Sequence, residues 1–508
     1  MNKSNKGIPH SIVSPMAAAI VGVEVKIGQM VEQGEIIATI ESMKMQTAIE
    51  SPVSGNVIDV NVIVGETIQS DHEICRIEES IGSSPAIKKT QSKAVDTRNP
   101  LDTLNQELQS SLDSGRTKAV SKRHAKGYRT ARENLHQLCD DGSFVEYGQL
   151  AVAAQRDRMS AEKLKSDTAA DGVITGLATI NRDQFGEHAT QVAVVINDYT
   201  VLAGTQGYFH HRKIDRILDQ AKRSFLPVVM YTEGGGGRPG DTDVKIQIAG
   251  LDVPTFATWA SLSGQVPMIA VNNGYCFAGN AALFGCGDIR IATKSSWIGM
   301  AGPAMIEGGG LGSFSPTDIG PIKIQAENGV VDLVADDESH ATELAKQCLS
   351  YFQGDNEDWQ SPDQLALRDM MPADRRYVYD VRSIINSLVD TASFIELTKD
   401  YGCAVITGFA RIEGRAIGLI ANDCRMLGGA VDAEAAEKTA RFITLCDNFD
   451  IPILSLCDSP GFMVGPASEE QAAVRRMAQL FVAGAKLSTP LVTIFLRKGY
   501  GLGAMAMA

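Results

Sequence analysis

The sequence lacks the features that mark several classes of protein. Its nine cysteines are scattered and include no Cys-x-x-Cys pair, which excludes a zinc ribbon and argues against a disulfide framework. No apolar run approaches the ~20 residues needed to span a bilayer, and residues 1–10 lack the apolar core of a signal peptide. We therefore expect a protein of the reducing cytoplasm that does not associate with a membrane.

Positive charge is also scarce. The chain has 47 Lys and Arg residues against 61 Asp and Glu residues, a net charge of −14, and no basic stripe with interleaved aromatics. A nucleic-acid partner is therefore not expected, and an anionic ligand must be held locally, by backbone amides or by a few Lys and Arg side chains. No Walker motif and no cluster of metal ligands is present beyond the adjacent His210-His211, so we expect neither an ATP-handling domain nor a metal site.

The N-terminal part of the chain contains an internal repeat. The 508 residues, 44% of them hydrophobic, suffice for several globular domains. The pattern of residues 23–41 returns 37 positions later. The repeated positions are Val25, Gly28, Val31, Gly34, Ile37, Ile40 and Glu41, which match Val62, Gly65, Ile68, Asp71, Ile74, Ile77 and Glu78. Two similar strand-rich halves predict a small all-β domain with internal two-fold symmetry over residues 12–79, after a flexible N-terminus at residues 1–11.

Lys44 lies in the segment that joins the two halves, between Met43 and Met45. A lysine at a hairpin tip is poorly placed for core packing and well placed for an enzyme that must modify it. The alternative is a solvated lysine in a small β module. With the flanks Ser14-Pro15-Met16 and Ser51–Gly55, this segment resembles the biotinyl (biotin carboxyl carrier) domain, whose signature is Met-Lys-Met. The resemblance implies a flattened barrel of the biotinyl/lipoyl type, with biotin attached covalently to Lys44 by a biotin protein ligase; lipoyl domains usually carry Asp-Lys-Ala.

The composition changes after Glu79. Ser80 to Pro100 is rich in Ser, Lys, Thr and Ala with little apolar periodicity, which is typical of a tether. Residues 101–140 contain charged segments with helical periodicity. We place a linker at residues 80–120, with a helical lead-in that begins within it.

A second and larger duplication follows. Its members are separated by 225 positions, and each copy has a predicted helix (214–224; 433–447), a short apolar strand (228–231; 453–457) and a glycine-containing loop. The matched pairs are Asn197/Asn422, Asp198/Asp423, Lys213/Lys438, Pro227/Pro452, Gly236/Gly461, Gly240/Gly465 and Gly274/Gly499. Alternation of strands and helices predicts two α/β domains, at residues 121–372 and 373–508.

The glycine loops are candidates for chemistry. Backbone N–H groups in such loops can face a ligand without side chains in the way, and two that converge on one oxygen form an oxyanion hole. The alternative is that these glycines serve tight turns and close helix packing. The candidate loops are Gly234–Gly237 and Gly274–Gly279 in the first copy, and Gly461 and Gly499–Gly503 in the second.

Residues 121–508 resemble the carboxyltransferase component of acyl-CoA carboxylases, which consists of two crotonase-like (β-β-α superhelix) domains. The motifs that carry this resemblance are Tyr128–Glu133, Asp141–Glu146, Gly408–Ile412, Arg441–Ile443, Asp458–Phe462 and Arg497–Gly501. The segment Gly234–Asp241 is similar to the variant found in multidomain, single-chain acyl-CoA carboxylases.

The resemblance implies an activity. Carboxyl transfer from carboxybiotin on Lys44 to the α-carbon of acetyl-CoA, propionyl-CoA or a longer acyl-CoA would give malonyl-CoA or a substituted malonyl-CoA. The implied sites comprise an acyl-CoA oxyanion hole at Gly235, Gly236 and Gly274, a biotin oxyanion hole at Gly501, Leu502 and Gly503, and CoA-binding residues Lys126, Arg129 and Arg132.

The resemblance also implies partners. Biotin carboxylase activity must come from a separate subunit or domain, and we expect a homo-oligomer whose sites combine the first copy of one subunit with the second copy of another. Because the chain stops inside the helix after the second glycine loop, we expect it to be a truncated fragment. Two alternatives remain, a biotin-dependent acyl-CoA decarboxylase with a membrane partner and an inactive carrier or scaffold.

Overall fold

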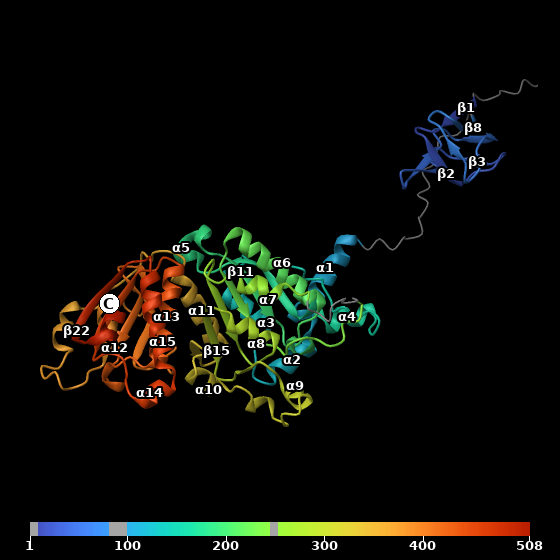
Figure 1. Ribbon diagram of the computed structural model, residues 1–508. Coiled ribbons are helices and arrows are strands. Elements are labelled where there is room, and N and C mark those ends of the chain that lie inside the picture. Colours follow the sequence, from blue (N-terminus) through green and yellow to red (C-terminus); the bar gives the residue numbers. More distant parts are fainter. Residues whose placement is uncertain (1–8, 81–98, 244–251) are drawn as a thin grey trace, which may run out of the picture. The chain divides into compact units, whose positions relative to one another are not determined.

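The computed structural model describes residues 9–80, 99–243 and 252–508. The chain divides into two compact units, Met1–Thr97 and Arg98–Ala508 (Figure 1). Residues 1–8 of the expected N-terminal segment and residues 81–98 of the expected linker lie outside the described residues. Within the described ranges, no helix combines the length and apolar character that a bilayer crossing requires.

Unit 1 consists of two four-stranded sheets, with strand orders β1-β8-β6-β3 and β5-β4-β2-β7. Alternating apolar residues close the core, in which Ile37, Ile40, Ile74 and Ile77 are fully buried. Residues 9–11, which we had expected in a flexible terminus, lie in β1. The strands are β1 (Pro9–Val13), β2 (Ala18–Val23), β3 (Met30–Val31), β4 (Ile36–Ser42), β5 (Met45–Glu50), β6 (Gly55–Val60), β7 (Thr67–Ile68) and β8 (Glu73–Glu79).

The backbone repeats with the period that the sequence predicted. Glu41 pairs with Gln46 across β4 and β5, and Glu78 pairs with Pro9 across β8 and β1. Glu78 lies 37 positions after Glu41, and Gln46 lies 37 positions after Pro9. The irregularity between Ile20 and Gly22 on β2 likewise returns on β6, 37 positions later. The two-fold symmetry therefore extends to the pairing register, and the small all-β fold is confirmed.

Unit 2 opens with helices. These are α1 (Pro100–Ser110), a short 3₁₀ turn at Asp113–Gly115, α2 (Thr117–His124) and α3 (Ala131–Leu138). Thr130 caps α3 in a reciprocal capping box with Glu133. Residues 100–120, which we had assigned to the linker, are thus largely helical, in keeping with the helical periodicity of that stretch.

The first copy is built on a seven-stranded sheet of order β17-β15-β13-β12-β11-β10-β9, antiparallel at β9–β11 and parallel from β11 to β17. A two-stranded sheet, β14 (Tyr275–Phe277) with β16 (Trp297–Gly299), accompanies it. The main strands are β9 (Val145–Tyr147), β10 (Val173–Thr179), β11 (Gln191–Asn197), β12 (Val228–Tyr231), β13 (Met268–Asn272), β15 (Ile289–Thr293) and β17 (Leu333–Ala335). The helices are α4 (Ala161–Asp167), α5 (Arg182–Ala189), α6 (Tyr208–Ser224), α7 (Thr255–Ala260), α8 (Gly279–Gly285), α9 (Pro303–Gly308), α10 (Ile322–Glu327) and α11 (Glu338–Ser350).

The second copy repeats this plan in a five-stranded sheet of order β18-β19-β20-β21-β22, antiparallel at β18–β20 and parallel from β20 to β22. Its strands are β18 (Ile395–Leu397), β19 (Val405–Ile412), β20 (Arg415–Asn422), β21 (Ile453–Ser459) and β22 (Leu491–Gly499). Its helices are α12 (Val381–Leu388), α13 (Ala433–Asn448), α14 (Pro466–Glu470), α15 (Ala473–Lys486) and α16 (Gly501–Met507). The duplication of an α/β unit is confirmed.

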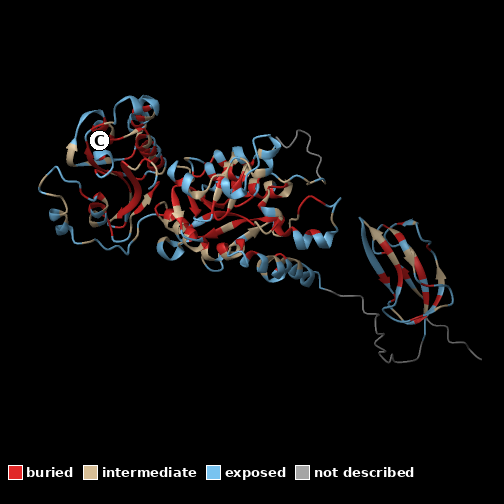
Figure 2. Cartoon of the chain, turned by 90° about the horizontal axis from the view of Figure 1, so that it is seen from below, coloured by how far each residue is buried: buried red, intermediate tan, exposed pale blue. Residues whose placement is uncertain are grey.

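One hydrophobic core joins the two copies, which lie side by side (Figure 1); it includes Ile196 and Ile291 of the first copy and Phe409 and Ile443 of the second. Arg441 on α13 adds an ion pair to Asp332 of the first copy, with 2.7 Å between nitrogen and oxygen. Figure 2 shows the sheets of this unit buried beneath helices with exposed outer faces. The two copies therefore act as one rigid support for their loops.

Each copy buries one lysine at the same position of its long helix. Lys213 on α6 donates to the carbonyl groups of Ala170 and Val173, and Lys438 on α13 donates to those of Thr398 and Tyr401. Burial lowers the pKa of both lysines from 10.5 to about 8. The charged form of each lysine is thus less stable in the folded protein than in the unfolded chain.

This burial gives an expected pH dependence. Between pH 8 and pH 10.5 the unfolded chain binds more protons at these lysines, so the free energy of unfolding rises with pH in that window. We expect Lys213→Met to remove about 2 kcal/mol of this rise between pH 8 and pH 10, measured by urea unfolding across the pH series. Lys222→Met, on the exposed side of the same helix, should leave the rise intact. Parallel curves for Lys213→Met and the unmodified protein would contradict the assignment.

Candidate active site

Lys44 lies in the two-residue turn between β4 and β5. Ser42 pairs with Met45, so Met43 and Lys44 are the two central residues, with φ angles of 50° and 68°. Met43 is 95% exposed and Met45 73% exposed, and Lys44 is exposed as well. The lysine is thus presented to solvent with its neighbours, as the attachment of biotin requires.

The same turn is locally unfavourable. Two-residue hairpin turns with positive φ at both positions favour Asn-Gly or similar pairs, and a left-handed conformation costs a residue with a side chain roughly 1–2 kcal/mol. Met43 and Lys44 therefore contribute nothing to the turn or to the core.

In the first copy, the glycine loop after β12 uses most of its N–H groups internally. Gly234 donates to the carbonyl of Tyr275 (2.7 Å) and Gly235 to that of Ala203 (3.1 Å). Gly236 donates to Oδ1 of Asn280 (2.9 Å). The expectation that Gly235 and Gly236 supply the oxyanion hole therefore does not fit the geometry, because both N–H groups already have acceptors.

The N–H groups that remain include those of Gly237, of Gly274 and of Gly279, the first residue of α8. None of the three finds an acceptor among the residues that the structure describes. The two loops lie against each other: a Cβ placed on Gly236 would be 2.7 Å from Cβ of Ala278 and 3.7 Å from the nitrogen of Gly279. The N–H of Gln206 donates to the carbonyl of Gly236, and the carbonyl of Gln206 accepts from the N–H of Arg238. These two bonds hold both neighbours of Gly237 in place.

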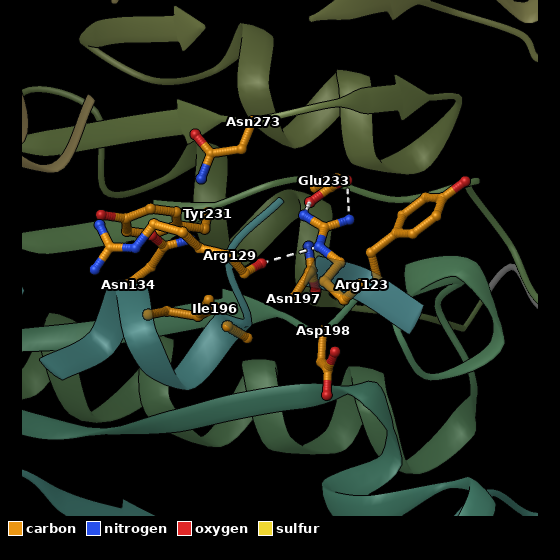
Figure 3. A pocket seen from close by; sticks show the side chains of 11 residues that line it. Arg123, Arg129, Asn134, Ile196, Asn197, Asp198, Tyr231, Glu233 and Asn273 are labelled. Atoms are coloured by element: carbon orange, nitrogen blue, oxygen red, sulfur yellow. Dashed lines mark hydrogen bonds and ion pairs between the residues drawn. The ribbon is translucent and has the colours of Figure 1, made fainter. Parts of the chain in front are cut away.

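Gly274 also lies against a buried carboxylate. A Cβ there would lie 2.4 Å from Oε1 of Glu233, so Gly274 leaves room for that side chain. The Glu233 carboxylate accepts from both terminal nitrogens of Arg123, at 2.9 and 2.7 Å (Figure 3). Burial raises the pKa of Glu233, and Arg123 acts against that rise. This buried ion pair anchors the start of the glycine loop.

The second copy repeats the loop with the offset of 225. Val431 accepts from Met463 (2.8 Å) and donates to Gly461 (3.0 Å), as Gln206 does with Arg238 (2.9 Å) and Gly236 (2.8 Å). Phe462 therefore corresponds to Gly237, and its N–H group also has no acceptor in the described part of the chain.

The second loop meets the first turn of α16. A Cβ on Gly503 would lie 2.4 Å from the carbonyl carbon of Gly461 and 2.6 Å from the nitrogen of Phe462. Gly501, Leu502 and Gly503 form the first turn of α16, where N–H groups lack intrahelical acceptors. Of the three residues expected at the second hole, Gly503 is thus brought beside Phe462.

Sequence reasoning included Gly237 and Gly279 only as the ends of candidate glycine loops, and Phe462 only as part of a motif, and assigned a donor role to none of them. The offset of 225 relates Gly237 to Phe462, but it could not show which N–H groups in either loop already had acceptors. Gly279 was visible only as a member of a glycine-containing run.

A buried carboxylate also anchors the second loop. Asp458 accepts from Nε of Arg497 (3.0 Å) and from the hydroxyl of Tyr379 (2.8 Å). Burial raises the pKa of Asp458, but the bonds from the Lys498 N–H, Tyr379 and Arg497 outweigh it, and the net pKa is lowered. Asp458 stays ionised and holds the loop.

A cavity of about 780 Å³ adjoins the first loop at Ala203 and Glu233. Its wall carries Lys118, Lys122 and Lys126, all exposed. Lys118 and Lys122 are four residues apart on α2, which places them on one face. These lysines form a cationic wall, which we call the lysine wall.

Two of the three expected CoA-binding residues are engaged elsewhere. Arg132 pairs with Glu146 at 2.9 Å, and the two side chains are only 11% and 9% exposed. Arg129 donates to Gln137 and to the carbonyl of Glu133. Only Lys126 faces the cavity, and Lys118 and Lys122 were missed although their spacing is visible in the sequence. In the described residues, no group of three or more His, Cys, Asp or Glu side chains could hold a metal ion.

Comparison with known families defines the class. Residues 122–508 match the carboxyl transferase domain, and residues 10–77 match the domain of biotin-requiring enzymes. The chain therefore belongs to the biotin-dependent acyl-CoA carboxyltransferase family, with biotin as its covalently bound cofactor.

Individual relatives share this organisation in whole or in part. The chain is 32% identical over 447 residues to the propionyl-CoA carboxylase beta chain of Saccharopolyspora erythraea, covering 83% of this chain and 78% of the relative. It is similar to the structure of a single-chain, multi-domain long-chain acyl-CoA carboxylase, with 49% identity and a TM-score of 0.79 over 100% of this chain. The chain spans only 48% of that protein. The transcarboxylase 12S structure is 29% identical with a TM-score of 0.70, covering 81% of this chain and 80% of the other.

These findings establish the general activity. The protein is an enzyme that transfers a carboxyl group between biotin and an acyl-CoA.

Proposed function

We propose that this protein transfers a carboxyl group from biotin on Lys44 to the α-carbon of an acyl-CoA, giving malonyl-CoA or a substituted malonyl-CoA. The observation that carries the proposal is that each copy brings two unbonded N–H groups together at its loop, those of Gly237 and Gly279 in the first copy and those of Phe462 and Gly503 in the second, which have no acceptor in the described chain. Two such sites suit a reaction in which negative charge develops on two different oxygens.

The first loop would act on the acyl-CoA. The N–H groups of Gly237 and Gly279 would donate to the thioester oxygen when removal of the α-proton gives it enolate character. A preorganised donor of this kind contributes about 3–4 kcal/mol to transition-state stabilisation. Gly235 and Gly236 would support the loop rather than donate, and Gly274, whose N–H has no acceptor in the described residues, stays a candidate donor.

The second loop would act on the cofactor. Bound biotin supplies the carboxyl group and a ureido oxygen that gains negative charge as that group leaves. The N–H groups of Phe462 and of the first turn of α16 would donate to this oxygen. The exposed Lys44 turn suits a carrier that must be reached by a biotin protein ligase and by a separate biotin carboxylase.

The lysine wall would hold the phosphates of CoA. A surface lysine contributes on the order of 1 kcal/mol to such a contact. We expect Lys118→Ala combined with Lys122→Ala to raise KM for acyl-CoA roughly 10-fold to 30-fold, with kcat nearly unchanged, because the phosphates lie far from the reacting thioester. The measurement is steady-state kinetics with matched acyl-CoA and acyl-pantetheine substrates.

The acyl-pantetheine substrate is the internal control, because it has no CoA phosphates. Its KM should be the same for the double variant and the unmodified enzyme. Lys163→Ala, which removes an exposed lysine of α4 outside the cavity, should change neither KM. An equal rise in KM for both substrates would place the CoA phosphates elsewhere.

The proposed direction is tested by adding a biotin carboxylase, ATP and labelled bicarbonate. Acetyl-CoA, propionyl-CoA and longer acyl-CoA substrates are screened for label in an acid-stable product. The relatives act on propionyl-CoA or long-chain acyl-CoA by name, so the screen spans both. Label in no product, from folded and biotinylated protein, would refute the proposal.

Decarboxylation is the second candidate, because the chain is 29% identical over 80% of its length to the methylmalonyl-CoA decarboxylase subunit alpha of Veillonella parvula. Conversion of methylmalonyl-CoA without label uptake in the forward assay would favour it. An inactive carrier or scaffold would transfer nothing in either direction, even with free biotin as acceptor.

We also propose that the enzyme is a homo-oligomer in which the first copy of one subunit and the second copy of another form each site. The transcarboxylase 12S relative is described as a hexamer. Light scattering coupled to size exclusion measures the assembly; full activity in a monomeric fraction would refute this arrangement.

A further inference from the structure

We propose that Arg238 and Asp241 are positioning residues that clamp the glycine loop of the first copy and hold the Gly237 N–H group in place. This inference rests on the proposed function, because it assigns to Gly237 a role in binding the thioester oxygen. Neither side chain is offered as a contact to substrate: the Arg238 side chain is only 3% exposed and that of Asp241 6%.

Arg238 follows Gly237 directly and is fixed at both its backbone and its side chain. Its N–H donates to the carbonyl of Gln206 at 2.9 Å. Its guanidinium donates to the carbonyl of Thr205 at 2.8 Å and pairs with the fully buried Asp171. The residue after Gly237 is therefore bound to segment 205–206 from two directions.

Asp241 ties the same loop to helix α6. One carboxylate oxygen accepts from the N–H of Tyr208, the first residue of α6, at 2.8 Å, and the other accepts from Gln155 at 3.0 Å. The helix is preceded by Gly207, which offers no side-chain cap. A Cβ on Gly207 would lie 2.3 Å from Nη1 of Arg238 and 2.4 Å from Oδ2 of Asp241. The glycine thus makes room for the clamp, and Asp241 takes over the capping.

The second copy has the same fold without the clamp. With the offset of 225, Arg238 corresponds to Met463 and Gly207 to Asp432. Asp432 caps its own helix α13 through Ala435 N–H at 2.8 Å. The fold of one copy therefore needs neither the arginine nor the glycine.

Only the first copy has the clamp, and the sequences of the two glycine loops give the reason. The first loop has four consecutive glycines, Gly234–Gly237, whereas the second has Ser459-Pro460-Gly461-Phe462. Glycine gains the most conformational freedom when a loop loosens, and proline restricts the second loop. A loop of four glycines needs external contacts to keep one N–H group in a fixed direction, and Arg238 and Asp241 supply them.

The test compares Arg238→Met, which copies the second repeat, with the unmodified full-length biotinylated enzyme. With biotin carboxylase, ATP, bicarbonate and the best acyl-CoA from the screen, we expect kcat to fall roughly 100-fold, comparable to the loss of one hole donor. KM should stay within about 3-fold, because binding of the CoA phosphates is unaffected. Hydrogen exchange in a peptide spanning residues 233–243 should accelerate.

Arg238→Lys keeps the charge but not the planar fork. Its kcat and its rate of hydrogen exchange should therefore lie between those of Arg238→Met and those of the unmodified enzyme. Arg290→Met is the matched control, because it removes another ion-paired arginine of the first copy, 12% exposed, which pairs with Asp332 at 3.0 Å. It should lower the melting temperature without changing kcat or the exchange of residues 233–243. A drop in kcat equal to that of Arg238→Met would indicate a merely structural role and overturn the inference.

Unchanged exchange in Arg238→Met would also overturn it, whatever the activity. Absence of turnover in the unmodified enzyme would refute the proposed function, and the exchange comparison would still decide whether the clamp exists.

Discussion

Lys44→Arg is expected to abolish covalent biotin and, with it, all turnover that depends on the carrier. Arginine keeps the positive charge of the turn but presents a guanidinium that stays protonated and cannot be acylated as the lysine amine is. The side chain lies in an exposed turn outside the core, so the melting temperature of the domain should not change. Streptavidin detection and intact mass measure the loss of biotin directly.

The matched control is Lys26→Arg, another exposed lysine of the same domain, which should retain full biotinylation. Free biotin added as acceptor should restore transfer in Lys44→Arg, because both loops of unit 2 are untouched. Persistent label in Lys44→Arg would move the attachment site elsewhere, and failure of free biotin to restore transfer would mean that the substitution affects more than the carrier.

Gly503→Ala should cut kcat roughly 100-fold or more, a loss of about 3 kcal/mol in transition-state stabilisation. The added methyl group would lie 2.4 Å from the carbonyl carbon of Gly461 and 2.6 Å from the nitrogen of Phe462. These are backbone atoms, so α16 and the loop must move apart, and the N–H groups of Phe462 and Gly503 move apart with them. Steady-state kinetics with free biotin as the acceptor isolates the effect from the carrier domain.

Gly484→Ala is the control for Gly503→Ala, because a Cβ at Gly484 in α15 would meet no atom within 4 Å. It should leave kcat unchanged and raise stability by roughly 0.5–1 kcal/mol, the gain expected for alanine in a helix. Gly503→Ala itself should lose no more than about 1–3 kcal/mol of stability from overpacking. Near-normal turnover in a folded Gly503→Ala enzyme would remove this loop from the site.

The two duplications were predictable because repeated folds need the same residues at the same places. The 37-residue repeat fixes apolar positions such as Ile37 and Ile74 in the core, and it reappears in the pairing of β4 with β5 and of β8 with β1. The strand Val228–Tyr231 and the helix that ends at Ser224 were found at the positions predicted from apolar periodicity and Leu226-Pro227. The linker boundary was less accurate, because a polar helix such as α1, with no buried residue, has a composition close to that of a tether.

The individual hydrogen-bond donors were not predictable. Whether a glycine N–H faces a ligand depends on whether a residue distant in sequence accepts from it, as Asn280 does from Gly236 and Ala203 does from Gly235. The same reason accounts for Arg132, which family resemblance offered as a ligand for CoA and which Glu146 instead holds in an ion pair.

The sequence by itself determined the turn at Lys44 and the two α/β copies, because these depend on local motifs and on periodic burial, and its resemblance to a known family implied the class of reaction. Only the tertiary structure decided which backbone N–H groups are left for a ligand and which cations face the cavity. Those properties depend on pairings between distant segments. Gly236 and Gly237 are neighbours, yet the N–H of Gly236 is bonded to Asn280 and the N–H of Gly237 has no acceptor in the described chain.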